Sequence, residues 1–353
     1  MRVLMLSTDQ NILKAGSEAQ NRMIEYGRLV EELHIIVRCR ALGVRFPKIG
    51  NVVIHPARLW QMYAMGKKVI KSLSYSSMII TCQDPFETGL IGYWLKRKFK
   101  LPLQLQIHTD FLSPYFRKES WKNKIRVLMG KALIKKADGI RVVSERLKKS
   151  LLTLGYALNP IYVLPIFVDV EKIKNAPINA DLHKKYPDYD FIILMSSRLT
   201  KEKNIKMAIE AFSEAISHKM EFRSLLLIVG EGPERKNLES RIKNYELSDN
   251  VKIEPWTDDL VSYYKTADLF LLTSDYEGYG RTVVEAAAAG LPVVMTDVGI
   301  ASGTVFPVGD KKKLSEILIG ILNKKIHPAV PEIKTRDKNS YLDGLKSSWE
   351  ELL

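Results

Sequence analysis

Two glutamates in the second half of the chain carry the most specific chemistry in the sequence. Glu277 follows an apolar run at residues 269–274, and Glu285 stands eight residues later in an alanine-rich stretch. We predict a strand over 269–274 and a helix that begins near Arg281. Carboxylates accept hydrogen bonds from vicinal hydroxyls, and a helix N-terminus favours phosphate. Together these groups predict a site for a sugar that carries phosphate, as in a nucleotide-sugar.

The frame around the two glutamates makes this prediction more specific. Gly290 and Pro292 end the predicted helix, and a second apolar strand is expected over residues 292–296. Two glutamates at this spacing elsewhere usually mark the solvated face of a helix. Between two buried strands, the loop and the helix start instead face the ligand side of a parallel sheet.

Three short blocks of this region carry a resemblance to a known family: Glu277-Gly278-Tyr279-Gly280, Glu285-Ala286 and Gly290-Leu291-Pro292-Val293-Val294. They closely resemble the donor-site block of the retaining glycosyltransferases of family 4, also called glycosyl transferases group 1. The resemblance covers nearly the whole chain in order and is strongest over residues 191–297. It implies the α/β GT-B fold, in which two Rossmann-like doubly wound domains face a central cleft and a C-terminal helix crosses back to the first domain.

The same resemblance assigns roles to the residues of the block. It implies that Glu285 binds the nucleotide ribose and that Glu277 contacts the donor sugar. The backbone of Gly278, Tyr279 and Gly280 is expected to contribute further donor contacts.

A basic pair follows the first predicted strand of the second half, residues 191–196. Arg198 lies in Ser197-Arg198-Leu199, and Lys203 opens the next helical segment. The pair resembles the arginine and lysine with which the family binds a diphosphate. A guanidinium and an ammonium together neutralise a pyrophosphate leaving group without a metal. Such a pair is also common in surface turns, but its place at the carboxyl end of a strand favours a binding role.

Glycines define a further candidate turn. Gly230-Glu231-Gly232-Pro233 follows the apolar run 225–229, but Arg235 occupies the third glycine position of a dinucleotide fingerprint, so that interpretation fails. The family has a similar turn at the border of its donor pocket. A tight entry into the next helix explains Gly230 equally well.

The first half contributes two more candidates. Gly16 lies in the loop after the first predicted strand, where family members often have a glycine pair that approaches the donor phosphate or the acceptor. His108 ends the predicted strand 103–108, where the family commonly has a histidine that faces the transferred sugar. A lone histidine is more often a structural hydrogen-bonding group. The predicted catalytic residues are thus His108, Arg198, Lys203 and Glu277.

Metal and cofactor sites are not expected. Asp188-Tyr189-Asp190 imitates the metal-binding motif of another glycosyltransferase fold, but it precedes the strand 191–196 and so lies at its amino end. No other cluster of carboxylates, histidines or cysteines has metal-ligand spacing. The co-substrate is expected to be a UDP- or GDP-linked sugar. After Gly299 the chain is shorter than is usual in the family, which we expect to alter how the donor pocket closes.

Length and hydrophobic patterning predict the domain organisation. A chain of 353 residues exceeds the usual span of one hydrophobic core, and apolar runs alternate with helical patterns throughout, as in parallel α/β sheets. We predict a first domain over 1–167, a nucleotide-sugar domain over 168–335 and a crossing helix over 336–353. Residues 169–190 are interpreted as the linker. A helix is expected over 18–33 and an amphipathic one over 339–353.

Charge is distributed unevenly between the two halves. Residues 1–167 hold 28 Lys and Arg against 11 Asp and Glu, whereas residues 168–353 hold 26 against 29. The first half is therefore expected to face an anionic membrane surface or a polyanionic acceptor. The segments 59–73 and 111–136 combine aromatic side chains with lysines, which suits a lipid headgroup boundary. Aromatic side chains in a domain core, with solvated lysines beside them, are the alternative.

Localisation follows from what the sequence lacks. No run approaches the roughly 20 apolar residues that span a bilayer, and the N-terminus lacks a signal-peptide layout. Cys39 and Cys82 are too few for a disulfide framework. We therefore expect a cytoplasmic protein that binds the inner face of the membrane peripherally, without a nucleic-acid partner.

The resemblance implies a metal-independent retaining hexosyltransferase. It would move a sugar from a nucleotide-diphosphate sugar to a lipid-linked or polysaccharide acceptor in envelope glycan synthesis. Retention is usually explained by front-face attack, in which the leaving phosphate helps to deprotonate the acceptor. Two alternatives remain on the same fold: a sugar-nucleotide epimerase, and a non-catalytic nucleotide-sugar-binding protein.

Overall fold

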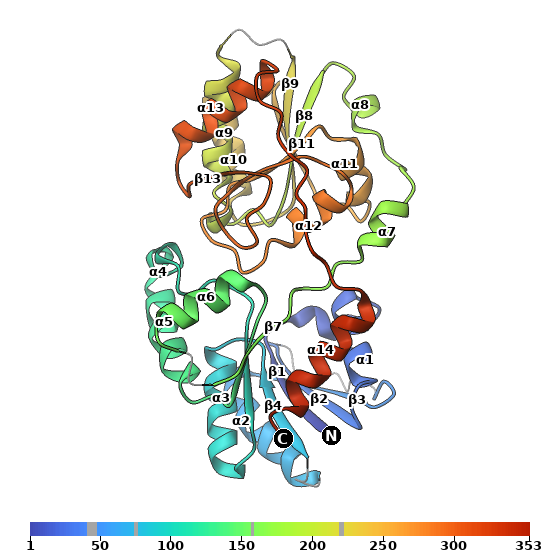
Figure 1. Cartoon of the computed structure of the whole chain (residues 1–353), viewed down its shortest axis with the longest axis vertical. Coiled ribbons are helices and arrows are strands. Elements are labelled where there is room, and N and C mark those ends of the chain that lie inside the picture. Colours follow the sequence, from blue (N-terminus) through green and yellow to red (C-terminus); the bar gives the residue numbers. More distant parts are fainter. Residues whose placement is uncertain (41–47, 74–76, 157–158, 219–221) are drawn as a thin grey trace. The chain divides into compact units, whose positions relative to one another are not determined.

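Two parallel α/β sheets organise the computed structural model of the chain (Figure 1), which describes residues 1–40, 48–73, 77–156, 159–218 and 222–353. The first unit comprises Met1–Leu112, Ser120–Pro165 and Arg336–Leu353, and the second comprises Ser113–Glu119 and Ile166–Thr335. Ser113–Glu119 therefore packs with the second unit, although it falls within the predicted first domain. The two sheets confirm the predicted pair of doubly wound domains.

The first unit is built on a seven-stranded sheet of order β3-β2-β1-β4-β5-β6-β7, with every pairing parallel. Its strands are β1 (Arg2–Ser7), β2 (Glu32–Arg38), β3 (Val52–Ala57), β4 (Met78–Cys82), β5 (Leu103–Ile107), β6 (Gly139–Val142) and β7 (Ile161–Val163). Both faces of the central strands are buried, which is why these strands read as continuous apolar runs without polar alternation.

Helices cover this sheet and connect its strands. They are η1 (Gln10–Leu13), α1 (Glu18–Gly27), α2 (Leu59–Ser72), α3 (Glu87–Phe99), α5 (Trp121–Ile134), α6 (Glu145–Thr153) and α14 (Lys338–Glu350). The predicted helix over 18–33 is wrong in its second part. α1 ends at Gly27, and Glu32 already begins β2, because Leu33 and the residues after it form a buried strand beside β1.

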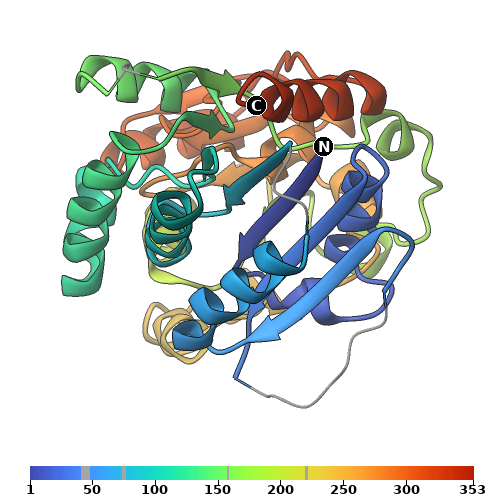
Figure 2. The ribbon, with the colours of Figure 1, turned by 90° about the horizontal axis from the view of Figure 1, so that it is seen from below.

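The last helix belongs to the first unit, as predicted. Tyr341, Leu345 and Trp349 of α14 are buried, and Trp349 Nε1 donates to Gln104 Oε1 of β5 at 3.1 Å. Gln104 Nε2 in turn donates to the carbonyl of Ser348 at 2.9 Å. Figure 2 shows α14 in red and β1 to β3 in blue. The helix is therefore held by a polar contact inside an apolar interface.

The second unit has a six-stranded parallel sheet of order β10-β9-β8-β11-β12-β13. Its strands are β8 (Phe191–Ser196), β9 (Ser224–Val229), β10 (Val251–Glu254), β11 (Leu269–Leu272), β12 (Val293–Thr296) and β13 (Thr304–Phe306). The chain runs outward from β8 to β10, then returns to pair β11 with the other side of β8. The strand order thus reverses between β8 and β11, and the carboxyl ends of these two strands are where an open α/β sheet binds ligands.

Helices cover both faces of the second sheet. They are α4 (Pro114–Glu119), α7 (Val170–Asn175), α8 (Leu182–Lys185), η2 (Lys201–Lys203), α9 (Ile205–Ile216), α10 (Arg235–Asn244), α11 (Leu260–Thr266), α12 (Arg281–Ala288) and α13 (Lys311–Leu322). One core lies under α9, α10 and α13, and the other lies under α8, α11 and α12. The stretch 169–190, interpreted as a linker, forms α7 and α8 and buries Leu182 and Tyr189 in the second core.

Two further sequence-based expectations concern the two cysteines and membrane-spanning helices. Cys39 and Cys82 are both buried and unbonded to each other. Within the described residues, no helix has the length and hydropathy needed to cross a bilayer.

Candidate functional site

The loops that follow β8 and β11 are joined to each other at the reversal of strand order. Thr273 Oγ1 donates to the carbonyl of Lys203 at 2.9 Å, and Asn204 Nδ2 donates to Asp275 Oδ1 at 2.8 Å. The backbone N–H of Asp275 also donates to the carbonyl of Glu202 at 2.8 Å. These bonds fix the two loops as one surface, so the residues they carry keep their relative positions.

Lys203 and Glu277 meet on this surface. The Lys203 ammonium donates to Glu277 Oε1, and both side chains are about four-fifths buried or more, at 15% and 16% exposure. Ser274 Oγ donates to the same carboxylate oxygen at 2.9 Å. The structure thus brings together the lysine predicted to bind diphosphate and the glutamate predicted to bind sugar. An incoming diphosphate would compete with Glu277 for the ammonium.

Arg198 lies in the same loop as Lys203 but in a different environment. Its side chain is 76% exposed and pairs with Glu202 Oε1 at 3.3 Å. Thr200 Oγ1 donates to that same Glu202 oxygen at 2.7 Å. The guanidinium is therefore held lightly at the surface of the loop, where it is accessible to an anionic ligand.

Glu285 lies in α12, directly after the loop that carries Glu277. Arg281 Nε donates to Glu285 Oε1 at 2.7 Å, and the Tyr264 hydroxyl donates to Glu285 Oε2 at 3.1 Å. Burial raises the pKa of Tyr264 well above its usual range, and the Glu285 charge adds to the effect. The phenol therefore stays a hydrogen-bond donor, and the carboxylate is oriented by two groups from the second unit.

The entry into α12 depends on Gly280. This residue caps the helix with φ of +98°, a left-handed backbone conformation that other residues rarely adopt. No side chain caps the first turn of α12. Its amide groups are consequently oriented toward the loop without a side-chain acceptor at the cap, which suits an anionic ligand.

Tyr279 contributes through its backbone. Its side chain is buried, and its carbonyl accepts from the N–H of Ile300 at 2.9 Å. A Cβ on Gly299 would lie 2.3 Å from that carbonyl oxygen, so the chain can pass here only as glycine. The short segment after Gly299 therefore packs directly on the Gly278–Gly280 loop. The β12–β13 connection thus lies against the backbone of the predicted donor loop.

Gly230 also has a backbone role. A Cβ at this position would lie 1.9 Å from the carbonyl oxygen of Ser197. The N–H of Leu199 donates to the Glu231 carbonyl at 2.8 Å, and the N–H of Glu234 donates to the Leu199 carbonyl at 3.0 Å. Gly230 lets this turn support the Arg198 loop at close range; a direct contact of Gly230 with the donor stays a prediction.

His108 lies in the first unit, immediately after β5. Its Nε2 contacts Gln106 Oε1 at 3.0 Å, and that oxygen also accepts from Arg141 Nη1 at 3.2 Å. Because arginine can only donate, the amide oxygen is an acceptor and His108 Nε2 carries the proton. Burial lowers the pKa of His108 to about 3, with help from Arg141 and Arg22. His108 is thus a neutral imidazole and a weak base.

Gly16 precedes α1 with φ of +74°, and the space around its missing side chain is open. Its N–H donates to Gln20 Oε1 at 3.0 Å, while its carbonyl accepts from Asn21 Nδ2 at 3.3 Å. The predicted contact of Gly16 with a phosphate would have to displace Gln20. That contact and the contact of His108 with the sugar stay predictions, since both residues belong to the first unit.

Metal-ligating side chains do not gather in the part of the chain that the structure describes: it holds no group of three or more His, Cys, Asp or Glu suited to a metal ion. Asp190 lies at the amino end of β8, as expected, and its carboxylate accepts from the backbone N–H of Arg223 at 2.9 Å. The Asp188-Tyr189-Asp190 motif therefore has a structural use.

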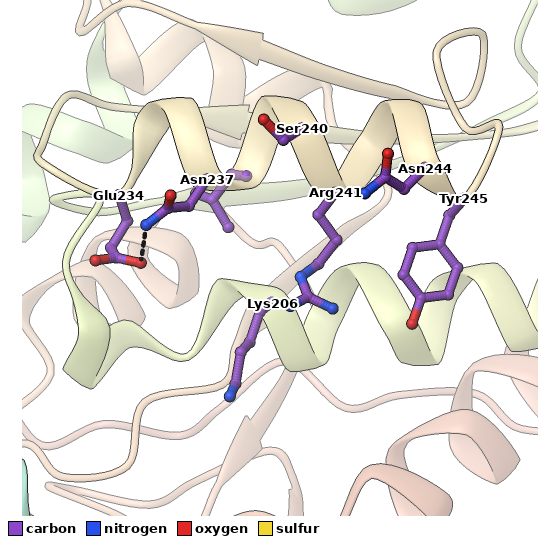
Figure 3. A pocket seen from close by; sticks show the side chains of 8 residues that line it. Lys206, Glu234, Asn237, Ser240, Arg241, Asn244 and Tyr245 are labelled. Atoms are coloured by element: carbon purple, nitrogen blue, oxygen red, sulfur yellow. Dashed lines mark hydrogen bonds between the residues drawn. The ribbon is translucent and has the colours of Figure 1, made fainter.

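A shallow hollow of about 350 Å³ lies between α9 and α10 (Figure 3). It is lined by Lys206, Glu234, Asn237, Leu238, Ser240, Arg241, Asn244 and Tyr245. Arg241 is already paired with Glu210 of α9 at 2.6 Å. None of the predicted site residues lines this hollow, and the joined β8 and β11 loops are the better candidate site.

Two family models match consecutive parts of the chain and together cover most of it. Residues 27–172 match Glycosyltransferase Family 4, and residues 180–332 match Glycosyl transferases group 1. The chain belongs to the group 1 glycosyltransferases. This membership confirms the resemblance drawn from the Glu277 and Glu285 blocks.

Curated relatives span several named activities. The chain is 29% identical over 266 residues to the alpha-monoglucosyldiacylglycerol synthase of Streptococcus pneumoniae, covering 71% of this chain. It is 29% identical over 227 residues to the 2-deoxystreptamine glucosyltransferase of Streptomyces kanamyceticus, covering 61% of this chain. The aligned region spans 58% of the length of each of these relatives.

Solved structures establish the GT-B fold. Anabaena Alr3699/HepE in complex with UDP has a TM-score of 0.69 at 18% identity, covering 100% of this chain and 95% of that one. The trehalose-6-phosphate structure from E. coli bound with UDP-2-fluoro glucose has a TM-score of 0.73 at 11% identity, covering all of both chains. The group 1 glycosyltransferase described here therefore has the predicted GT-B fold.

Proposed function

We propose that this chain is a retaining hexosyltransferase that uses a nucleoside-diphosphate sugar as its donor. The observation that carries the proposal is the joined surface at the carboxyl ends of β8 and β11. It presents Lys203, Arg198 and Glu277 together, next to the uncapped start of α12. Two cations and a helix N-terminus suit a diphosphate, and a neighbouring carboxylate suits sugar hydroxyls.

The donor is expected to be UDP-linked or GDP-linked. Structures of the neighbour Anabaena Alr3699/HepE are described in complex with UDP and with UDP-glucose, which makes UDP-glucose the first donor to test. Glu285, oriented by Arg281 and Tyr264, supports a contact with the ribose hydroxyls. The nucleotide-sugar is consumed as a co-substrate, so no separate cofactor is needed.

The proposed reaction places most of its electrostatic stabilisation on the leaving group. The bond between the anomeric carbon and the diphosphate oxygen breaks, and an acceptor oxygen bonds to the same face of that carbon. The acceptor proton goes to the departing phosphate. Lys203 and Arg198 stabilise the charge that develops on the diphosphate, without a divalent cation. A neutral His108 with a pKa of about 3 suits a hydrogen-bonding role toward the sugar better than that of a base.

A basic and aromatic surface of the first unit supports the proposal that the acceptor is associated with a membrane. We name it the α5 surface; it consists of Trp121, Ile125, Leu128 and the lysines beside them. Trp121 is 66% and Leu128 70% exposed, and the spacing of the three apolar residues places them on one stripe of α5. Lys122, Lys124 and Lys131 lie on the same helix.

A second exposed group lies on α2, which packs against α3, and α3 in turn packs against α5 (Figure 1). Trp60 is 71% exposed with Arg58 over its ring, and Lys67 lies over Tyr63. An amphipathic surface of aromatic and basic side chains suits the headgroup region of an anionic bilayer, at about 1 kcal/mol per basic residue.

Part of the earlier interpretation of these segments is corrected by the structure. Met62, Phe111 and Phe116 are buried, so these three belong to packed cores and are unavailable to a lipid. For these three residues, the alternative interpretation as core side chains is the correct one. The exposed Trp60 and Trp121 remain as candidates for membrane contact.

The acceptor is proposed to be lipid-linked, with a polysaccharide as the other outcome. The name of the Streptococcus pneumoniae relative, alpha-monoglucosyldiacylglycerol synthase, supports a glycolipid acceptor. The exposed apolar stripe of α5 favours the same choice, since a soluble glycan needs only the charge. We propose that the protein acts in envelope glycan or glycolipid synthesis at the cytoplasmic face of the membrane.

Product analysis tests the proposed function. The protein is incubated with UDP-glucose or a GDP-linked hexose, with and without vesicles that contain diacylglycerol lipids. We expect release of nucleoside diphosphate to depend on acceptor, and a glycosylated lipid whose anomeric configuration matches the donor. Conversion of the donor sugar without acceptor would indicate an epimerase. Donor binding detected by thermal shift without turnover on any acceptor would indicate a non-catalytic binding protein.

A further inference from the structure

Helix α4 is connected in sequence to the first unit at both ends, yet it packs on the second. Its neighbours in the chain, Leu112 and Ser120, belong to the first unit, whereas Ser113–Glu119 groups with the second. Within the second unit, α4 packs against η2, the turn that ends with Lys203. The chain on either side of α4 therefore does not explain why this helix packs on the second unit.

Two side chains of α4 contact Tyr276, the residue directly before Glu277. Phe116 is buried and meets the Tyr276 ring edge to face, with 5.4 Å between ring centroids and 77° between planes. The Tyr276 hydroxyl donates to Glu119 Oε2 at 2.5 Å. Burial and the bond to Glu119 raise the pKa of Tyr276 well above its usual range, so the phenol remains a donor.

The same loop is fixed from its other side by the β8 loop. Asp275 bonds to Asn204 and to the backbone of Glu202, and Glu277 bonds to Lys203. The Tyr276 side chain, by contrast, makes its hydrogen bond and its ring contact with α4. Without α4, the Tyr276 side chain would lose both of these contacts.

We propose that Phe116 and Glu119 of α4 position the Glu277 loop through Tyr276, so that Tyr276 and Glu119 are positioning residues of the donor site. The ring contact with Phe116 fixes the distance between the loop and α4, and the hydrogen bond to the Glu119 carboxylate fixes the rotamer of the Tyr276 side chain. Glu277 follows because it is the next residue. This inference rests on the proposed function for its consequence, which is selective contact with the donor sugar.

Three variants and a control separate this contact from general packing. Tyr276→Phe and Glu119→Ala each remove the hydrogen bond but keep the Phe116–Tyr276 contact. Glu119→Gln keeps an acceptor oxygen and is the rescue variant. Tyr115→Phe is the matched control: it removes a phenol hydrogen bond from the same helix to the Val308 carbonyl, at 3.3 Å, away from the Glu277 loop.

Hydrogen exchange measures the positioning directly, on the full chain and without donor. Amides of residues 274–280 should exchange about tenfold faster in Tyr276→Phe and in Glu119→Ala, the scale of one hydrogen bond to a charged group. The double variant should show no further increase, because both changes remove one interaction. Tyr115→Phe and Glu119→Gln should stay within about twofold of wild type. Unchanged exchange in Tyr276→Phe, or equal acceleration in Tyr115→Phe, would overturn the inference.

Donor binding then tests the consequence. Tyr276→Phe should weaken binding of the intact nucleotide-sugar about tenfold while changing binding of the nucleoside diphosphate less than twofold. Equal weakening of both would mean that Tyr276 supports the fold of the site and does not position Glu277. If the wild-type protein binds no nucleotide-sugar at all, the proposed function fails, and the exchange experiment alone still decides whether α4 positions the loop.

Discussion

Lys203 and Glu277 form an ion pair across 74 positions of sequence, between the loops that follow β8 and β11. Each was singled out in sequence for a different part of a nucleotide-sugar. Their pairing means that part of the charge of the site is neutralised internally. Under the proposed function, a diphosphate that bound Lys203 would free Glu277 to contact the sugar, so one binding event would prepare both contacts.

Replacing Lys203 and replacing Arg198 should lower turnover to a similar extent but should change the unfolding free energy by different amounts. Alanine at either position should lower turnover by roughly 10²–10³, because each removes a charge that stabilises the leaving diphosphate. Lys203→Ala also leaves Glu277 mostly buried without its cation and should cost about 1–3 kcal/mol of unfolding free energy. Arg198 is 76% exposed, so its loss should change that free energy by less than about 0.5 kcal/mol. Denaturant unfolding and steady-state kinetics measure the two effects, and a large loss of stability in Arg198→Ala would contradict its assignment.

The two glutamates should divide donor recognition between them. Glu285→Ala should weaken binding of the nucleoside diphosphate, since Glu285 is oriented in α12 by Arg281 and Tyr264. Glu277→Ala should reduce discrimination between donor sugars and leave binding of the nucleoside diphosphate less affected. Calorimetric titration with nucleoside diphosphate and with two nucleotide-sugars measures both. An equal loss of affinity for free nucleoside diphosphate in the two variants would show that the division is wrong.

Sequence patterns predicted the second unit closely because its strands are buried on both faces. The strand predicted over 191–196 has those limits in β8, the strand predicted over 292–296 starts one residue later in β12, and the strand predicted over 269–274 ends two residues earlier in β11. The helix predicted over 18–33 extends too far at its C-terminal end, because the local pattern does not show where the strand begins. The polar pair before Leu33 continues a helical pattern, and only pairing with β1 makes Glu32 the start of a strand.

Contacts between distant residues lay outside what the sequence could show. Arg198, Lys203 and Glu277 were found because their motifs are local, but Tyr264 and Tyr276 have no local signal. Their roles depend on partners far away in sequence. The segment 111–136 read as one aromatic and basic stretch, and spacing could not distinguish the buried Phe116 from the exposed Trp121.

Activity should not depend on a divalent cation. The expectation rests on the basic pair of Arg198 and Lys203, which supplies positive charge where the diphosphate leaves. Turnover with UDP-glucose in excess EDTA should equal turnover in buffer that contains magnesium or manganese. Full loss of activity in EDTA, restored by manganese, would contradict the metal-independent mechanism.

Acid should destabilise the protein partly through two half-buried histidines, His55 and His108. Burial lowers the pKa of His55 to about 4 and that of His108 to about 3, whereas an unfolded histidine titrates near 6.5. Below pH 6.5 the unfolded chain therefore binds protons that the folded chain does not, and stability falls as the pH drops toward 4. His108→Gln should lose less unfolding free energy between pH 7 and pH 4 than wild type. Chemical denaturation at several pH values measures the slope, and an unchanged slope in the variant would contradict the low pKa of His108.

Membrane binding should require both the charge and the apolar stripe of the first unit. Full-length protein should float with vesicles that contain an anionic phospholipid, and binding should fall as salt is raised, because basic residues near the surface contribute about 1 kcal/mol each. Replacing Lys67, Lys68 and Lys71 should weaken binding at low salt. Trp121→Ser with Leu128→Ser should reduce binding that persists at high salt, since the exposed stripe of α5 is the apolar part of the surface. Replacing Lys311, Lys312 and Lys313 of α13, in the second unit, removes equal charge and serves as the control. Failure of the wild-type protein to float at low salt would remove the membrane proposal and leave a polyanionic glycan as the acceptor that the same charge attracts.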